Sequence, residues 1–263
     1  MNFLSLFTGI GGIDLGLTWA GMNTTGQVEI NEACRCWLKH HWPNVKRWSD
    51  IRDFSFQKWT DHYGDNTKID LIAGGFPCQD ISVAGKGKGI EGARSGLWKE
   101  MFRIICEFKP RWILVENVPA LRTRGADRVL ADLESEGYAC ETQVVGACHA
   151  GACHTRKRVY IVAHSDGQRL SKRREISIGT EKKVTKSSSQ CRYEWPAPPG
   201  QRQREFEKPR LVEFGMGGTD DGISTRILEL ANMEALIGYG NAVIPQVIQA
   251  IGQSIIQIEK EMR

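Results

Sequence analysis

The sequence has no long apolar run, no amino-terminal signal segment and no internal repeat. The missing apolar run argues against a membrane-spanning helix, and the missing signal predicts that the chain stays in the cytoplasm. In that reducing compartment the eight cysteines are predicted to be free thiols, not a disulfide framework. With 263 residues, 41% hydrophobic and 25% charged, the chain is long enough to bury one large core.

Positive charge is concentrated in one part of the chain. The formal net charge is +4, but residues 165–210 contain twelve Lys or Arg against six Asp or Glu, so the remainder carries −2. The same segment contains the serine run 187–189 and prolines at 196, 198 and 199, and it has little hydrophobic periodicity. Composition alone is typical of a solvated linker, whereas the basic charge is typical of a segment that binds nucleic acid.

Short apolar runs alternate with helical patterns along most of the chain. This alternation predicts an α/β fold with a doubly wound, mainly parallel sheet. The expected strands are 2–7, 24–29, 69–74, 111–116, 138–146 and 157–163, and the expected helices are 12–20, 31–41, 54–62, 97–108, 126–136 and 243–259.

The end of the predicted strand 69–74 carries a cysteine. Gly74 and Gly75 end the strand, Pro77 stiffens the following turn, and Cys78 comes next. Ligands in open α/β sheets bind at the carboxyl ends of the strands, so a thiol there faces a binding crevice. The alternative is a small, inert core residue, because free cysteines are often buried.

A carboxyl group follows the next buried strand. Glu116 and Asn117 come at the end of strand 111–116 and precede Val118 and Pro119. Taken alone, this could be a turn or a helix cap. Because neighbouring parallel strands end at the same edge of a sheet, Glu116 and Cys78 are expected to face one pocket.

The first strand runs into the glycine loop Thr8-Gly9-Ile10-Gly11-Gly12, which is typical of a nucleotide-binding turn. A dinucleotide fingerprint has a glycine three positions after Gly11, but this chain has Asp14, whose charge disfavours a pyrophosphate. Glu29, at the end of the next strand, is placed to bind ribose hydroxyls. S-adenosylmethionine, with an adenosine and a cationic centre, suits both positions, although the loop by itself could be a structural turn.

In this order the motifs resemble those of the cytosine-C5 DNA methyltransferases, and the chain is similar to their small bacterial or phage-type members. Phe7–Gly12 resembles the first cofactor motif, Gly75–Gln79 the nucleophile motif and Glu116–Val118 the acid motif. Arg156–Tyr160 resembles the Arg-x-Arg motif and residues 240–243 the closing motif. The resemblance covers roughly residues 1–165 and 226–257.

The resemblance implies a Rossmann-like S-adenosylmethionine-dependent methyltransferase fold and three groups of site residues. The catalytic residues would be Cys78, Glu116, Arg156 and Arg158. The cofactor-binding residues would be Phe7, Thr8, Gly9, Gly11, Gly12, Glu29, Ile30, Asp50, Ile51, Pro77, Asn241 and Ala242, with Ile30 where many members have a tryptophan. The DNA or base contacts would be Gln79, Ser82, Lys86, Arg94, Asn117, Val118, Arg173 and Arg174.

The chemistry of cytosine gives these catalytic residues their roles. Carbon 5 is a poor nucleophile until the Cys78 thiolate attacks carbon 6 and makes the ring an enamine. Glu116, with a pKa raised by burial, would donate a proton to ring nitrogen 3, and Arg158 would hold the carbonyl oxygen. The base must first be flipped out of the duplex, and the glycine-rich, basic segment 82–96 is expected to close over it, unless it is an ordinary flexible loop.

The resemblance also implies the domain organisation and the partners. Residues 1–164 would form the cofactor-binding and catalytic domain, 165–225 a short basic target-recognition region, and 226–263 a segment that returns to the catalytic domain. The expected partner is double-stranded DNA, with a separately encoded restriction endonuclease as a further one, and the chain is expected to be a monomer. The gene would be chromosomal or carried by a prophage in a bacterial cell.

Several alternatives remain open at this point. A tRNA-methylating relative would use the same cysteine and acid, a catalytically silent homologue would only bind DNA, and a nicotinamide dehydrogenase would share the glycine loop. Cys148, His149, Cys153 and His154 have the residue types of a zinc site. Because neighbouring ligands rarely converge tetrahedrally and this stretch aligns with a loop of the family, we predict no metal.

Overall fold

The computed structural model describes residues 1–64, 67–77, 96–150, 155–165 and 243–262. Among these residues no helix is both long enough and apolar enough to cross a membrane. The basic segment and the residues that follow Pro77 up to position 95 lie outside the described residues.

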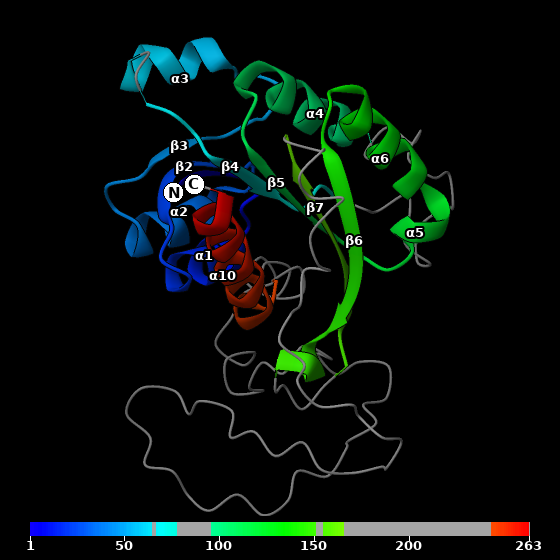
Figure 1. The fold of residues 1–263 in the computed structure, drawn as a ribbon. Helices are drawn as coiled ribbons and strands as arrows, with labels where there is room; N and C mark the ends of the chain where they lie inside the picture. Colours follow the sequence, from blue (N-terminus) through cyan, green and yellow to red (C-terminus); the bar gives the residue numbers. More distant parts are fainter. Residues whose placement is uncertain (65–66, 78–95, 151–154, 166–242, 263) are drawn as a thin grey trace, which may run out of the picture.

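One seven-stranded sheet forms the centre of the molecule (Figure 1). Its strand order is β3-β2-β1-β4-β5-β7-β6, in which β1 to β5 are parallel while β7 runs antiparallel to β5 and β6. The strands are β1 (Asn2–Leu6), β2 (Asn23–Val28), β3 (Lys46–Trp48), β4 (Leu71–Gly74), β5 (Trp112–Asn117), β6 (Ala139–Gly146) and β7 (Lys157–His164). The predicted mainly parallel, doubly wound α/β sheet is therefore confirmed.

Helices cover both faces of the sheet and join its parallel strands. Within the described residues they are α1 (Gly12–Trp19), α2 (Glu32–His41), α3 (Phe56–Tyr63), α4 (Leu97–Phe108), α5 (Leu121–Arg124), α6 (Ala126–Ser135) and α10 (Pro245–Met262), together with the 3-10 turn η2 (Ala147–Ala150). Side-chain caps begin two of them, because Asn31 accepts a hydrogen bond from Cys34 N and Ser55 from Lys58 N. Pro245 is the first residue of α10, where its missing N–H costs nothing.

Each face of the sheet has its own hydrophobic core. On one face Leu4, Ile72 and Ile113 pack against residues of α3, α4 and α6. On the other face Leu71 and Leu114 pack against residues of α1 and α10. Figure 1 shows α10 beside α1, on the opposite side of the sheet from α4 and α6. The continuous apolar runs of β4 and β5 follow from this burial on both faces.

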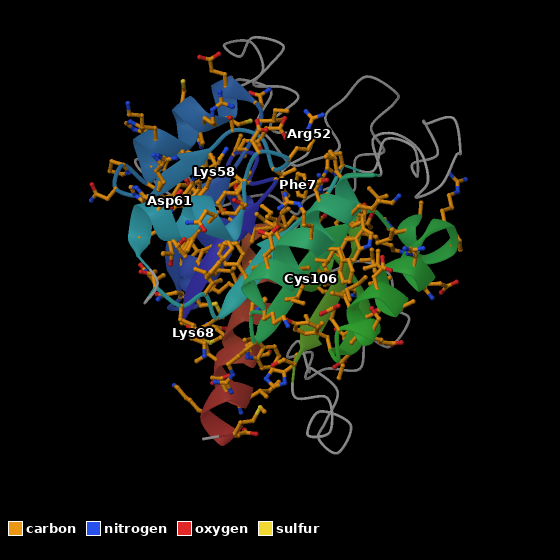
Figure 2. The ribbon with its side chains drawn as sticks, turned by 90° about the horizontal axis from the view of Figure 1, so that it is seen from above. Phe7, Arg52, Lys58, Asp61, Lys68 and Cys106 are labelled. Atoms are coloured by element: carbon orange, nitrogen blue, oxygen red, sulfur yellow. The ribbon has the colours of Figure 1, made fainter. Side chains whose placement is uncertain are left out.

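The path of the chain creates a switch point between β1 and β4. From β1 the chain moves outward through β2 to β3, and then it crosses back to place β4 on the other side of β1. At such a point the loops after the two central strands diverge and leave a ligand crevice at their carboxyl ends. In Figure 2, Phe7 and Arg52 lie toward one end of the strands, and Lys68, which precedes β4, lies toward the other end.

Candidate active site

The glycine loop after β1 is held in a fixed and partly strained conformation. Phe7, the first residue of the loop, has a φ of 54° although it is not a glycine. Thr8 N donates a hydrogen bond to Val28 O, which joins the loop to the end of β2. A Cβ on Gly12 would lie 2.7 Å from Val243 O, so the segment before α10 closes directly over the loop. Backbone strain of this kind is concentrated at ligand sites, where the surrounding structure maintains it.

Glu29 is buried beside the loop and is oriented by two backbone amides. Its Oε2 accepts a hydrogen bond from Gly9 N at 2.7 Å, and its Oε1 accepts one from Asn31 N at 2.8 Å. From α2, Arg35 Nη1 donates to the carbonyl oxygens of Glu29 and Ile30. Each carboxylate oxygen has a second lone pair, so the group can still accept hydrogen bonds from a diol. The side chain of Ile30 is 65% exposed and borders the same strand end.

Asp50 and Ile51 follow β3 at the same edge of the sheet. Arg52 forms a bidentate ion pair with Asp50, and these hydrogen bonds lower the pKa of the Asp50 carboxyl below its usual value. Ile51 is buried in the core that also contains Leu6 and Phe76. Asp50 therefore keeps a charged side chain at this edge, while the side chain of Ile51 is packed in the core.

Asp14 does not act on a ligand in the way that its charge suggested. Its side chain is fully buried, where Oδ2 accepts a hydrogen bond from Ser5 Oγ and Oδ1 one from Gln27 Nε2, each at 2.8 Å. Burial raises the pKa of the carboxyl to about 6. Asp14 thus joins α1 to β1 and β2 beneath the loop. The expectation that its charge would face and repel a pyrophosphate is wrong, because this carboxyl lies in the interior.

The turn after β4 brings the nucleophile motif against the acid motif. A Cβ on Gly75 would lie 2.7 Å from Glu116 Oε2, so a larger residue there would displace the carboxylate. Asn117 Nδ2 donates a hydrogen bond to Phe76 O, and Asn117 Oδ1 accepts one from Val118 N. These contacts fix the turn up to Pro77, and they support a positioning role for Asn117. Its contact with a base stays a prediction.

Glu116 is buried and paired with an arginine from the neighbouring strand. Arg158 Nε, on β7, lies 3.1 Å from Glu116 Oε1. Burial raises the pKa of Glu116 above its usual value, while the charges of Arg158 and Arg156 oppose that shift. The expectation that burial raises this pKa is therefore confirmed. A raised pKa makes this carboxyl group better suited than an exposed one to donate a proton to a basic nitrogen.

The structure thus brings together the described residues of both predicted groups, the cofactor-binding residues and the catalytic residues. Nine predicted site residues lie outside the described residues: Cys78, Gln79, Ser82, Lys86, Arg94, Arg173, Arg174, Asn241 and Ala242. The zinc pattern is only half described, because Cys153 and His154 also lie outside, and His149 Nδ1 accepts a hydrogen bond from Gly146 N. The prediction that no metal binds there is not tested.

Two residues that hold the site in place were not predicted from the sequence. Arg35 anchors the end of β2, and Arg103, on α4, anchors the segment around Ile51. The spacing of Glu100, Arg103 and Glu107 on one face of a helix was a usable signal for a partly exposed charge cluster. The carbonyls that Arg103 reaches are about fifty residues away in the sequence, and no local pattern points to them.

Comparison with known proteins identifies the family. Residues 1–205 match the family described as C-5 cytosine-specific DNA methylase. This match covers most of the chain, and the chain belongs to that family.

Among curated relatives, the chain is 36% identical over 171 residues to the Type II methyltransferase M2.BsuMI of Bacillus subtilis, covering 62% of this chain and 42% of the relative. It is 35% identical over 162 residues to M.CviJI of a Paramecium bursaria Chlorella virus, covering 61% and 42%. The chain thus spans less than half the length of these relatives.

Solved structures support the fold. A prophage-encoded protein of E. coli matches with a TM-score of 0.58 at 22% identity, covering 70% of this chain and 52% of that one. The Entamoeba histolytica methyltransferase EhMeth matches with a TM-score of 0.54 at 18% identity, covering 63% and 53%.

Proposed function

We propose that this protein transfers a methyl group from S-adenosylmethionine to carbon 5 of a cytosine in double-stranded DNA. The observation that carries the proposal is the place of Glu116, a buried acid with a raised pKa against the turn that leads directly into Cys78. Membership of the family and similarity to proteins named Type II methyltransferases support DNA as the substrate.

The residues around the glycine loop fit this cofactor. Glu29 offers two acceptor oxygens whose positions are set by Gly9 N and Asn31 N, as binding of two ribose hydroxyls requires. The exposed side chain of Ile30 supplies apolar surface for an adenine, the buried Ile51 would line that surface from the core, and Asp50 would add an acceptor at its edge. When bound, S-adenosylmethionine supplies an electrophilic methyl group, and Phe7, Pro77, Asn241 and Ala242 complete its proposed site.

In the proposed mechanism the Cys78 thiolate forms a bond to carbon 6 of the flipped cytosine, and the electrons of the carbon 5–carbon 6 double bond become available at carbon 5. Glu116 donates its proton to ring nitrogen 3, so that no negative charge remains on the ring. Arg158, whose Nε lies 3.1 Å from Glu116 Oε1, would orient that carboxyl and hold the carbonyl oxygen of the base. After carbon 5 is methylated, it loses its proton, the carbon–sulfur bond breaks, and the thiolate is regenerated.

The remaining proposals concern the substrate and its recognition. The segment 82–96 would close behind the flipped base, with Lys86 and Arg94 on phosphates, and the region 165–225 would hold DNA through Arg173 and Arg174. A role in DNA protection beside a restriction endonuclease follows from the kind of relative that the chain resembles. We also propose that the protein acts in the cytoplasm of a bacterial cell, where its DNA substrate would lie.

The experiment that tests the proposal measures transfer of a labelled methyl group from S-adenosylmethionine to duplex DNA, with tRNA as the competing substrate. We expect 5-methylcytosine in DNA with the wild-type chain. Cys78→Ser should bind cofactor normally but transfer no methyl group, because an alcohol at this position cannot form the adduct at neutral pH. Label in tRNA alone, or full activity of Cys78→Ser, would contradict the proposal.

A further inference from the structure

Arg103 lies on α4, outside every motif of the proposed site, yet it binds the backbone of that site. Its Nη2 donates hydrogen bonds to Ile51 O at 2.8 Å and to Phe54 O at 2.9 Å. Its Nε donates to Glu100 Oε2 at 2.9 Å and its Nη1 to Glu107 Oε1 at 2.6 Å. One guanidinium thus joins two carboxylates of its own helix to two carbonyls after β3.

A second contact from α4 extends this attachment. Glu107 Oε2 accepts a hydrogen bond from Phe56 N at 2.8 Å, at the first residue of α3. The segment from Ile51 to Phe56 is therefore fastened to α4 at three backbone groups. Its first residue, Ile51, belongs to the pair that the proposed function places against the adenine.

The first turn of α4 contacts the nucleophile turn. The rings of Trp98 and Phe76 are 5.5 Å apart between centroids, and Trp98 Nε1 donates a hydrogen bond to Asp132 Oδ2 on α6 at 2.8 Å. Trp98 is 1% exposed, so its position is set by packing. Figure 2 shows α4, which carries the labelled Cys106, lying over the sheet. A single helix therefore touches both the turn before Cys78 and the segment after β3.

We propose that Arg103 is a positioning residue that fixes the adenine-binding pair, Asp50 and Ile51, relative to the nucleophile turn through α4. This inference rests on the proposed function and names a residue on which cofactor affinity depends without contact to the cofactor. A planar guanidinium can serve two carbonyls and two carboxylates at once, whereas an ammonium on a flexible stem cannot hold the same four acceptors in place. Without Arg103, the partly buried Phe54 O loses this donor and Ile51 O keeps only the hydrogen bond from Phe54 N at 3.2 Å, so the segment loses its attachment to α4 at both carbonyls.

The test compares Arg103→Met and Arg103→Lys with a matched control, Lys99→Met, which removes one exposed positive charge from the same helix. Calorimetry gives the Kd for S-adenosylmethionine, and steady-state methyl transfer gives KM and kcat. We expect Arg103→Met to raise the Kd and the KM for S-adenosylmethionine about 10- to 30-fold. This is the usual loss of affinity when a hydrogen bond to a charged group is removed. At saturating cofactor, kcat and the affinity for DNA should match those of Lys99→Met.

Arg103→Lys keeps the charge between the two carboxylates, so it is expected to fold even if Arg103→Met does not. Its Kd for S-adenosylmethionine should rise about 3- to 10-fold, since only part of the hydrogen-bond set is lost. A lower melting temperature with an unchanged Kd in both variants would make Arg103 merely structural and overturn the inference. If the wild-type chain itself binds no S-adenosylmethionine, the proposed function fails as well, so the two failures are distinguishable.

Discussion

Three buried carboxyl groups lie near the carboxyl ends of the central strands, and their hydrogen-bond partners give them different properties. Glu29 accepts from two backbone amides, Asp14 accepts from two neutral side chains, and Glu116 is paired with Arg158. Burial raises the pKa of both Asp14 and Glu116. Of these two, Glu116 lies against the nucleophile turn, so it is the acid that can act on a substrate.

The contacts of Glu29 lead to a prediction for its two simplest substitutions. Glu29→Ala should weaken binding of S-adenosylmethionine by about 1.5–3 kcal/mol, roughly ten- to hundredfold in Kd, because hydrogen bonds to the carboxylate are lost. Glu29→Gln should lose nearly as much, since its NH₂ group must face the N–H of either Gly9 or Asn31. Calorimetry on both, with the exposed Glu32→Gln as control, measures this effect. Unchanged affinity in Glu29→Ala would move the ribose site elsewhere.

Asp14 makes the stability of the fold depend on pH in a direction opposite to that of an ion-paired acid. The folded state keeps the Asp14 proton up to about pH 6, whereas the unfolded chain releases it near the ordinary aspartate pKa of 3.8. The folded state therefore binds more protons between these values, and its stability falls as the pH rises through them. The free energy of unfolding falls by about 1.4 kcal/mol per pH unit, and the total loss approaches about 3 kcal/mol. This loss persists above pH 6.

Asp14→Asn removes this titration while it keeps an acceptor for Gln27, and the Ser5 hydroxyl can turn to accept from the new amide. Urea unfolding of both proteins at several pH values gives their free energies of unfolding. The free energy of unfolding of the variant should increase relative to that of the wild type as the pH rises from 4 to 7. A difference that stays constant over this range would mean that Asp14 does not titrate there.

At the scale of elements, α10 is the part of the chain that returns from the far end of the sequence to support the glycine loop. It packs on α1, and residues with short side chains lie where the two helices cross. A Cβ on Gly16, for example, would lie 2.4 Å from Pro245 O. At the other end of α10, Trp112 Nε1 donates a hydrogen bond to Glu259 Oε2, and Arg111 forms an ion pair with the same carboxylate. The helix is thus fixed at both ends, and α1 is held by it.

Gly252 gives a direct test of this packing. A Cβ there would lie 2.8 Å from Ala20 Cβ, which has no flexible end to move away. Gly252→Leu should destabilise the protein by about 1–3 kcal/mol, as overpacking of a well-packed core does. Gln253→Leu introduces the same side chain at the next, exposed position and should leave the melting temperature nearly unchanged. Equal melting temperatures for the two variants would contradict the close crossing of α1 and α10.

The elements also show which features a sequence can predict. The continuous apolar runs that became β4 and β5 were predicted because burial on both faces requires them. The edge strand β3 was missed, since its three residues, Lys46, Arg47 and Trp48, have no strand-like alternation. The short helix α5 was missed for the same reason, because four residues contain no period.

At the scale of the whole molecule, the motifs predicted which strand ends meet, but not the contacts between elements that fix them. Glu116 was expected to share an edge with the nucleophile motif because topology alone requires it. The approach of Gly75 to Glu116, the burial of Asp14 and the reach of Arg103 all depend on tertiary packing. Such contacts join residues that no local pattern relates.

The central claim of this account is that Cys78 forms a covalent bond to the target cytosine, and one measurement tests it most directly. The wild-type chain is incubated with S-adenosylmethionine and a DNA that it methylates, remade with 5-fluorocytosine in place of cytosine. Fluorine at carbon 5 blocks the final elimination, so a complex that resists denaturant should accumulate, and mass spectrometry of its peptides should place the adduct on Cys78. An active wild-type protein that forms no such complex, or an adduct that persists in Cys78→Ser, would contradict the account.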